Sequence, residues 1–173
     1  MNELYELLGG PGYFTVNQAS CTTTYESNHS CSNCYSPNVL NANWFKSIFG
    51  NVSYTSFPVS SGYAQAGWSC LGFSHFAAYY IFRDPDHPNA EVTASKIGTY
   101  SFNEANAKAY AQTGDLIRFD SSHSAICYYS DSNGMYVLDC NYGVNRTQCR
   151  VDKHYILYSK YSNFTINRCD NAE

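Results

Sequence analysis

The sequence predicts an α+β protein in which helices come first and antiparallel strands follow. Two patterns indicate this class. An apolar, helix-competent stretch runs from Cys70 to about Phe82 and ends before Pro85. From residue 115 onward the apolar residues recur with a period of two, which is the pattern of half-buried strands. We therefore expect a helix that packs on a small antiparallel sheet.

Cap and turn residues locate the remaining elements. A helix is predicted over 41–50, where four apolar side chains share one face. A short strand follows near 97–102. Asn103 is a good N-cap for a helix over 104–112, which Gly114 closes. The later strands are predicted at 115–119, 123–129, 135–141, 149–151 and 155–161, joined by short turns.

Length and composition exclude several classes of function. A chain of 173 residues suits one domain with a sizeable core. The net charge is −4, with only 10 Lys and Arg and no basic run, so we expect no nucleic-acid partner. No stretch approaches the ~20 apolar residues of a membrane span, so we expect no insertion into a membrane. We expect a monomer.

Two parts of the chain differ in character. Residues 1–60 are irregular and rich in Ser, Thr, Asn and Tyr, and we expect a helix-containing extension that packs on the domain formed by 61–173. Glu3 and Glu6 lie where a signal peptide would carry basic residues. Eight cysteines and a low charged fraction of 14% nevertheless favour an oxidising compartment, so we predict a secreted protein whose leader has been removed.

The cysteines are assigned by position. Cys140 and Cys149 bracket a short loop, and we predict a disulfide between them. Cys127 lies inside an apolar strand and is predicted to be an inert buried thiol. Two further disulfides are predicted among Cys21, Cys31, Cys34 and Cys169. Zinc bound by Cys21, His29, Cys31 and Cys34 is the weaker alternative, so no metal or cofactor is predicted.

The candidate chemistry begins at Cys70. A thiol at a helix N-terminus lies against unpaired backbone N–H groups and the positive end of the helix dipole, and both favour the thiolate. His123 then opens one predicted strand, and Asp139 and Asn141 lie on the next. A nucleophile, a base that accepts its proton and a group that orients the base are the three roles of a cysteine hydrolase. Either Asp139 or Asn141 can fill the third role.

Each of these residues alone is more often structural. A cysteine at the head of an apolar helix usually packs or forms a disulfide, and a histidine between serines is usually polar surface. The three in this order, each at the end of its predicted element, favour the catalytic interpretation. The other histidines, His29, His75, His87 and His154, are given no role.

Residues 65–160 resemble the CHAP and NlpC-type cysteine hydrolases. The resemblance rests on Cys70 opening a helix, on the strand 114–119 just ahead of His123, and on Asp139-Cys140-Asn141 in the strand after it. CHAP domains typically carry a Glu-x-Asn pair as the third element, and here Asp replaces Glu. These families are papain-like amidases and endopeptidases of bacterial and phage origin that cut peptidoglycan.

The resemblance implies a papain-like fold and cleavage of an amide bond through a thioester on Cys70. The backbone N–H of Cys70 and one further donor would bind the oxyanion, and Gln65 is the candidate for that donor. The aromatic residues Tyr63, Trp68 and Tyr142 are candidates for the walls of the substrate groove.

The sequence thus predicts a secreted cysteine hydrolase with cell-wall peptidoglycan or its peptides as substrate. Two alternatives remain open at this level. One is a secreted protease or deamidase that acts on protein. The other is a disulfide-rich binding module that keeps the hydrolase fold without activity.

Overall fold

The computed structural model describes residues 12–13, 59–60, 70–87, 90–140 and 150–170. Two helices, α3 (Cys70–Phe82) and α4 (Glu104–Tyr110), lie among these residues together with eight strands. The strands are β1 (Gly12–Tyr13), β2 (Val59–Ser60), β3 (Val92–Ser101), β4 (Leu116–Phe119), β5 (His123–Ser130), β6 (Gly134–Cys140), β7 (Arg150–Leu157) and β8 (Asn163–Cys169).

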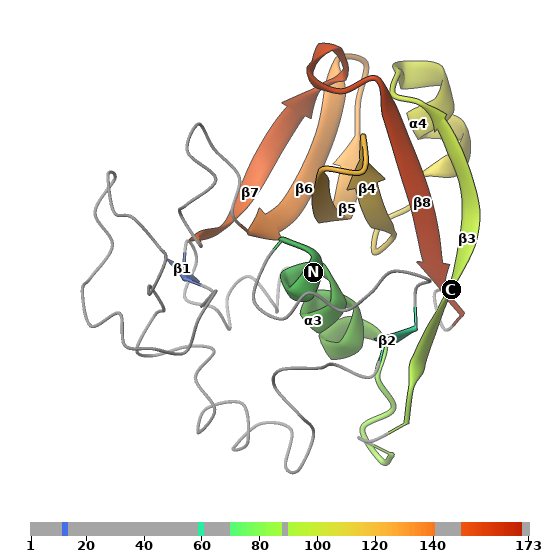
Figure 1. Ribbon diagram of the computed structural model, residues 1–173, viewed down its shortest axis with the longest axis vertical. Helices are drawn as coiled ribbons and strands as arrows, with labels where there is room; N and C mark the ends of the chain where they lie inside the picture. The colour runs from blue at the N-terminus through green and yellow to red at the C-terminus, as the bar shows by residue number, and fades with distance from the viewer. Residues whose placement is uncertain (1–11, 14–58, 61–69, 88–89, 141–149, 171–173) are drawn as a thin grey trace.

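The strands form one sheet in the order β1-β7-β6-β5-β4-β8-β3-β2. Every pair is antiparallel except the two-residue contact between β2 and β3. Figure 1 shows the sheet above α3, with α4 beside β3 at the far edge. The predicted α+β class is confirmed at this level, because helix and antiparallel sheet are both present.

The strand predictions hold for β4, β5 and β6 and fail on both sides of them. β3 begins five residues earlier than predicted, at Val92. The two strands expected at 149–151 and 155–161 are one continuous strand, β7, followed by a 3-10 turn at Tyr158–Lys160. β8 was not predicted. Its apolar alternation breaks at Asn167, a polar residue that is nonetheless buried.

Helix α3 has the predicted bounds. It is buried on most of its surface, including Phe73, Phe76 and Tyr79, so tertiary packing supplies its stability. Beyond its C-terminus, the Arg83 guanidinium bonds the carbonyl of Tyr80 and lies over the Tyr80 ring. A cation at this end complements the helix dipole. The helix packs mainly against β5 and β6.

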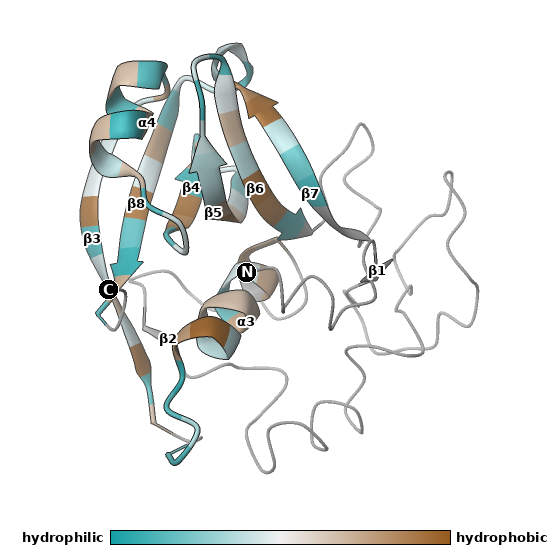
Figure 2. Cartoon of the chain, turned by 180° about the vertical axis from the view of Figure 1, so that it is seen from behind, coloured by the Kyte–Doolittle hydropathy of each residue, from teal (hydrophilic) through white to brown (hydrophobic). Residues whose placement is uncertain are grey.

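A hydrophobic core lies between the sheet and α4, which Figure 2 shows beside β3. Its centre is a group of aromatic rings in edge-to-face contact, in which Phe102 meets Phe119 at 5.0 Å and Phe164 at 5.3 Å between ring centroids. Phe102 directly precedes Asn103, the predicted N-cap, whose side chain accepts a hydrogen bond from the Asn106 N–H. The core therefore unites β3, β4 and β8, which are distant in sequence. The predicted end of the helix after Asn103 at 112, closed by Gly114, is wrong, because α4 ends at Tyr110 with Ala111 as its C-cap.

A tight turn between β4 and β5 sets the start of β5. Asp120 and Ser121 have positive φ values of 40° and 53°, and the Ser122 N–H donates to the Phe119 carbonyl. Aspartate tolerates this left-handed conformation better than most residues. The Asp120 carboxylate also accepts hydrogen bonds from the N–H groups of Ser162 and Asn163, at 2.9 and 2.7 Å. The turn is therefore tied to the beginning of β8.

Gly114 and Asp115, the dipeptide ahead of β4, have structural roles. Gly114 has φ +93°, and a Cβ there would lie 2.7 Å from the Phe82 ring. Asp115 is buried and bonds the Arg168 guanidinium through both carboxylate oxygens at 2.8 Å. It also accepts from the Gln112 N–H. This bidentate pair joins the loop before β4 to β8.

Some predictions fall outside the described residues. The predicted helix over 41–50 is one of them. Of the extension 1–60, only β1 and β2 are described, and they pair with β7 and β3. Neither helix in the described part of the chain is long and apolar enough to cross a membrane.

Replacing Asp115 by alanine should lower the free energy of unfolding by about 3 kcal/mol, because the partly buried Arg168 loses its ion-pair partner. Urea unfolding followed by circular dichroism measures this loss. Glu104→Ala is the matched control, since it removes an exposed carboxylate paired with Lys108. Its cost should stay below about 1 kcal/mol. Equal losses in the two variants would contradict a structural role for the Asp115–Arg168 pair.

Candidate active site

Three of the predicted site residues come together where α3 meets the sheet. Cys70 is the first residue of α3, and His123 is the first residue of β5. Asp139 lies near the end of β6, opposite Ala125 of β5. His123 and Asp139 are therefore diagonal neighbours across the hairpin that β5 and β6 form. Figure 1 shows the end of β6 pointing toward α3.

The β5–β6 hairpin closes through the predicted turn ahead of Gly134. The Asp131 carboxylate accepts hydrogen bonds from the N–H groups of Asn133 and Gly134 at 2.8 and 3.0 Å. The Asp131 N–H in turn donates to the Gly134 carbonyl at 3.0 Å. A turn of this kind fixes the register of its two strands. The register in turn sets which residue of β6 lies beside His123.

His123 is held by a buried carboxylate. Its Nε2 lies 2.7 Å from Oδ2 of Asp139, and the two residues are 6% and 0% exposed. Because Nε2 is engaged in this way, Nδ1 is the ring nitrogen that remains for Cys70. Phe119 stacks on the imidazole with its ring centroid 6.5 Å away. Of the two residues that the sequence offered as the orienting group, Asp139 is the one seen in contact with His123.

The surroundings of Cys70 favour its thiolate. Partial burial raises the pKa of the thiol, but a hydrogen bond with His123 and the positive charge of the imidazolium outweigh this effect. A hydrogen bond from the Ser124 backbone N–H and the charge of Arg118 act in the same direction. The net result is a pKa below the usual value for cysteine.

His123 shifts in the complementary direction. Burial alone would lower the pKa of its imidazolium, but hydrogen bonds to Asp139 and Cys70 raise it, as do their negative charges. Together they raise the pKa of His123 to about 9. The lowered pKa of Cys70 and the raised pKa of His123 both favour the thiolate–imidazolium form of the pair, the reactive form of a cysteine nucleophile with a histidine partner.

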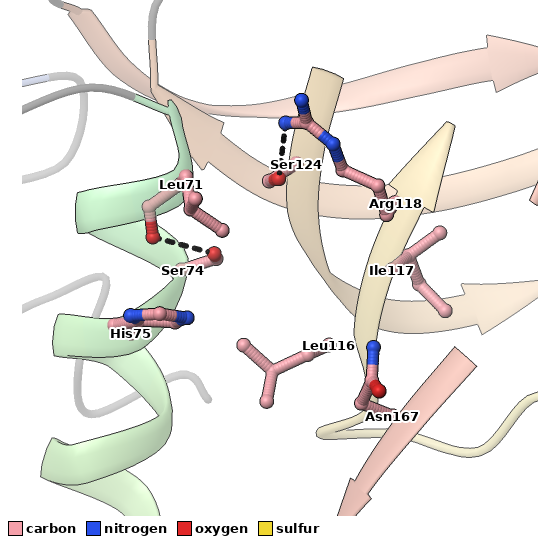
Figure 3. A pocket seen from close by; sticks show the side chains of 8 residues that line it. All are labelled: Leu71, Ser74, His75, Leu116, Ile117, Arg118, Ser124 and Asn167. Atoms are coloured by element: carbon pink, nitrogen blue, oxygen red, sulfur yellow. Dashed lines mark hydrogen bonds between the residues drawn. The ribbon is translucent and has the colours of Figure 1, made fainter. Parts of the chain in front are cut away.

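Arg118 borders the site from β4. Its guanidinium donates to the Ser124 hydroxyl at 2.8 Å and to the Ser121 carbonyl. Figure 3 shows Arg118 at one end of a small pocket between α3 and the sheet. Leu71, Ser74 and His75 of α3 line the pocket together with Leu116, Ile117, Arg118, Ser124 and Asn167.

His75 is part of this seam between α3 and the sheet. Burial lowers the pKa of its imidazolium to about 4, so the ring is neutral at pH 7. No role was predicted for His75, and its burial beside Leu116 is that of a packed core residue. Among the described residues, no group of His, Cys, Asp and Glu is arranged to hold a metal ion.

His154 of β7 belongs to the site, although the sequence analysis gave it no role. Its Nδ1 contacts Oδ1 of Asp139, the carboxylate oxygen that His123 does not use. The strand register places His154 opposite Val137, so it is a diagonal neighbour of Asp139. A signal was present in the sequence, since His154 is in phase with the buried Ile156. This signal was overlooked because β7 was predicted as two separate strands with residue 154 between them.

Other predicted residues lie outside the described part of the chain. These are Asn141, the oxyanion candidate Gln65 and the groove candidates Tyr63, Trp68 and Tyr142. The predicted disulfide between Cys140 and Cys149 also rests on side chains that are not described. The alternative zinc ligands also lie outside the described residues: Cys21, His29, Cys31 and Cys34.

The structure tests the predictions for two cysteines, Cys127 and Cys169. Cys127 is a free, buried thiol as predicted, and burial raises its pKa to about 12. Cys169 was expected among the disulfide-forming residues, and this is wrong. It is free and buried at the end of β8, where burial and the charges of Asp115 and Asp170 raise its pKa to about 12.

Comparison of the chain with models of known protein families, with curated proteins and with solved structures gives no match. The function must therefore be inferred from the geometry and electrostatics of the site itself.

The pKa shifts predict how Cys70 reacts with iodoacetamide. Between pH 9 and pH 6 a thiol with the reference pKa of ~8.5 slows on the order of a hundredfold. Cys70 should slow by clearly less than this, because the His123 imidazolium stabilises its thiolate. Peptide mass mapping after timed alkylation of the unreduced protein measures this. Cys127 and Cys169 should stay unlabelled.

His123→Ala is the companion variant for this experiment. It removes the hydrogen bond and the charge that lower the Cys70 pKa and leaves the opposing effect of burial. Alkylation at pH 6 should slow at least about tenfold, which corresponds to one pKa unit. An unchanged rate would show that the two side chains are not coupled.

Proposed function

We propose that the protein is a cysteine hydrolase that cleaves an amide bond, with a papain-like arrangement of its site and bacterial cell-wall peptide as substrate. The observation that supports this most is the Cys70–His123–Asp139 chain. A half-buried thiol at a helix N-terminus meets an imidazole whose other nitrogen is held by a buried carboxylate. A nucleophile, its base and the group that orients the base are thus in contact.

The reaction begins with attack of the Cys70 thiolate on the carbonyl carbon of the substrate amide. Sulfur forms a bond to carbon, and the carbonyl oxygen becomes an oxyanion. The first backbone N–H groups of a helix have no partner within it, so those at the start of α3, beside Cys70, can donate to the oxyanion. His123 then transfers its Nδ1 proton to the leaving amine as the C–N bond breaks, and a thioester remains on Cys70.

Hydrolysis of the thioester returns the site to its first state. Neutral His123 takes a proton from water, and the hydroxide formed attacks the thioester carbon. The C–S bond breaks, a carboxylic acid leaves, and Cys70 becomes a thiolate beside the imidazolium again. Asp139 holds the ring through Nε2 in both half-reactions, so Nδ1 faces the reacting atoms throughout.

Two features support a peptide of the cell wall as substrate. The resemblance of residues 65–160 to CHAP and NlpC-type hydrolases is the first. The second is Arg118, whose positive charge lies close enough to Cys70 to stabilise its thiolate. Such a charge also favours a substrate that carries a carboxylate near the cleaved bond, as peptidoglycan stem peptides do. Secretion, inferred from composition, would place the protein where this substrate is found.

Cys70→Ala should abolish hydrolysis of purified peptidoglycan, with a loss of more than about a thousandfold, because no other group in the site can form the thioester. Turbidity loss and the release of new amino or carboxyl groups measure the reaction. The thermal midpoint should change little, since the half-exposed thiol adds little to the core.

Cys127→Ala is the matched control, because it removes a buried thiol that takes no part in the reaction. It should keep the activity, at the cost of some stability. Cleavage of casein but not of cell walls would point to a protease instead. Tight binding of cell walls with no cleavage, together with an unreactive Cys70, would refute the hydrolase proposal.

A further inference from the structure

Asp139 contacts two imidazoles at once. Its Oδ2 lies 2.7 Å from Nε2 of His123, and its Oδ1 contacts Nδ1 of His154. The three residues come from neighbouring strands, β5, β6 and β7. With Cys70 they form a chain of four side chains that runs from the helix N-terminus across three strands.

The exposure of the residues changes along this chain. Asp139 is 0% exposed and His123 is 7% exposed in their side chains, whereas the His154 side chain is 24% exposed. A buried carboxylate is stable in its charged form only when hydrogen bonds replace the water it has lost. Two ring N–H groups do this here, one at each oxygen. Without the donor at Oδ1, that oxygen would lose the hydrogen bond that fixes the orientation of the carboxylate.

A carboxylate turned away from Nε2 would support the His123 imidazolium less, and Cys70 would lose part of the charge that stabilises its thiolate. We propose that His154 is a positioning residue for the nucleophile. By donating from Nδ1 to Oδ1, it holds the Asp139 carboxylate in the orientation in which Oδ2 meets His123. This inference rests on the proposed function, since it assigns a role within the same site. His154 itself does not touch the reacting atoms.

Three substitutions of His154 separate this role from simple packing. Asparagine places its side-chain N–H₂ close to the position of Nδ1 and so keeps the donor to Oδ1. Glutamine places its donor near the position of Nε2, and alanine has none. Lys153→Gln is the control for the strand, because Lys153 lies on the other face of β7, with its ammonium 4.7 Å from the Tyr128 ring centroid.

The measurement is the rate of Cys70 alkylation by iodoacetamide between pH 5 and pH 9, with thermal midpoints recorded for each variant. At pH 6, His154→Ala and His154→Gln should be about tenfold slower than the unsubstituted protein, with the rise of the rate displaced to higher pH. His154→Asn and Lys153→Gln should stay within about twofold.

The proposal would be overturned if His154→Asn and His154→Gln reacted at equal rates. It would also be overturned if neither His154→Ala nor His154→Gln slowed the alkylation of Cys70. The Asn and Gln pair decides the matter even if the alanine variant unfolds. The two proposals fail differently. An unreactive Cys70 in the unsubstituted protein contradicts the hydrolase, whereas a reactive Cys70 that is indifferent to position 154 contradicts only the role of His154.

Discussion

The burial of one carboxylate constrains much of the site. Asp139 has no exposed surface, and a charge in that setting must be matched at both of its oxygens by donors from the protein. Those donors come from the strands on either side, so the register of β5, β6 and β7 is fixed by chemistry as well as by packing. A slip of one residue in either pairing would turn one imidazole to the opposite face of the sheet. The geometry that orients His123 and the geometry that stabilises this part of the sheet are therefore the same.

Cys70 is shaped by two opposed influences. Partial burial raises the pKa of the thiol, while His123, the Ser124 N–H and Arg118 lower it. The groups that lower the pKa of Cys70 lie on two other elements, β5 and β4. α3 itself contributes only the position of the thiol at the start of the helix. The thiol is therefore an ordinary one whenever α3 and the sheet are apart. The packing of α3 on β5 and β6, which buries Phe73 and Phe76, also brings Cys70 to the groups that lower its pKa.

Local signals in the sequence were sufficient for part of this structure. The bounds of α3 follow from an apolar stretch that ends before a proline, and β4 to β6 follow from alternation and short turns, so Cys70, His123 and Asp139 were all found. The predictions that failed depend on contacts between residues that are far apart in the sequence. β8 is polar in places because Arg168 pairs with Asp115 in the loop before β4, and because Asn167 is buried beside the pocket under α3. Such partners lie far away in the chain, so no pattern within β8 reveals them. His154 was missed because β7 was predicted as two strands; its phase with Ile156 places it on the buried face, but only the pairing of β7 with β6 places it beside Asp139.

The place of β8 in the sheet has a consequence for the order of events in a living cell. Asp120, which shapes the turn before His123, is bonded to the backbone of Ser162 and Asn163, 42 and 43 residues later in the chain. Ribosomes add about 5–20 residues per second, so a nascent chain carries its thiol and its histidine for several seconds before that support exists. During that time β3 and β4 have no strand between them to join them. The Cys70–His123 pair is thus completed late in synthesis, which limits the time in which an activated thiol is present on an unfinished protein.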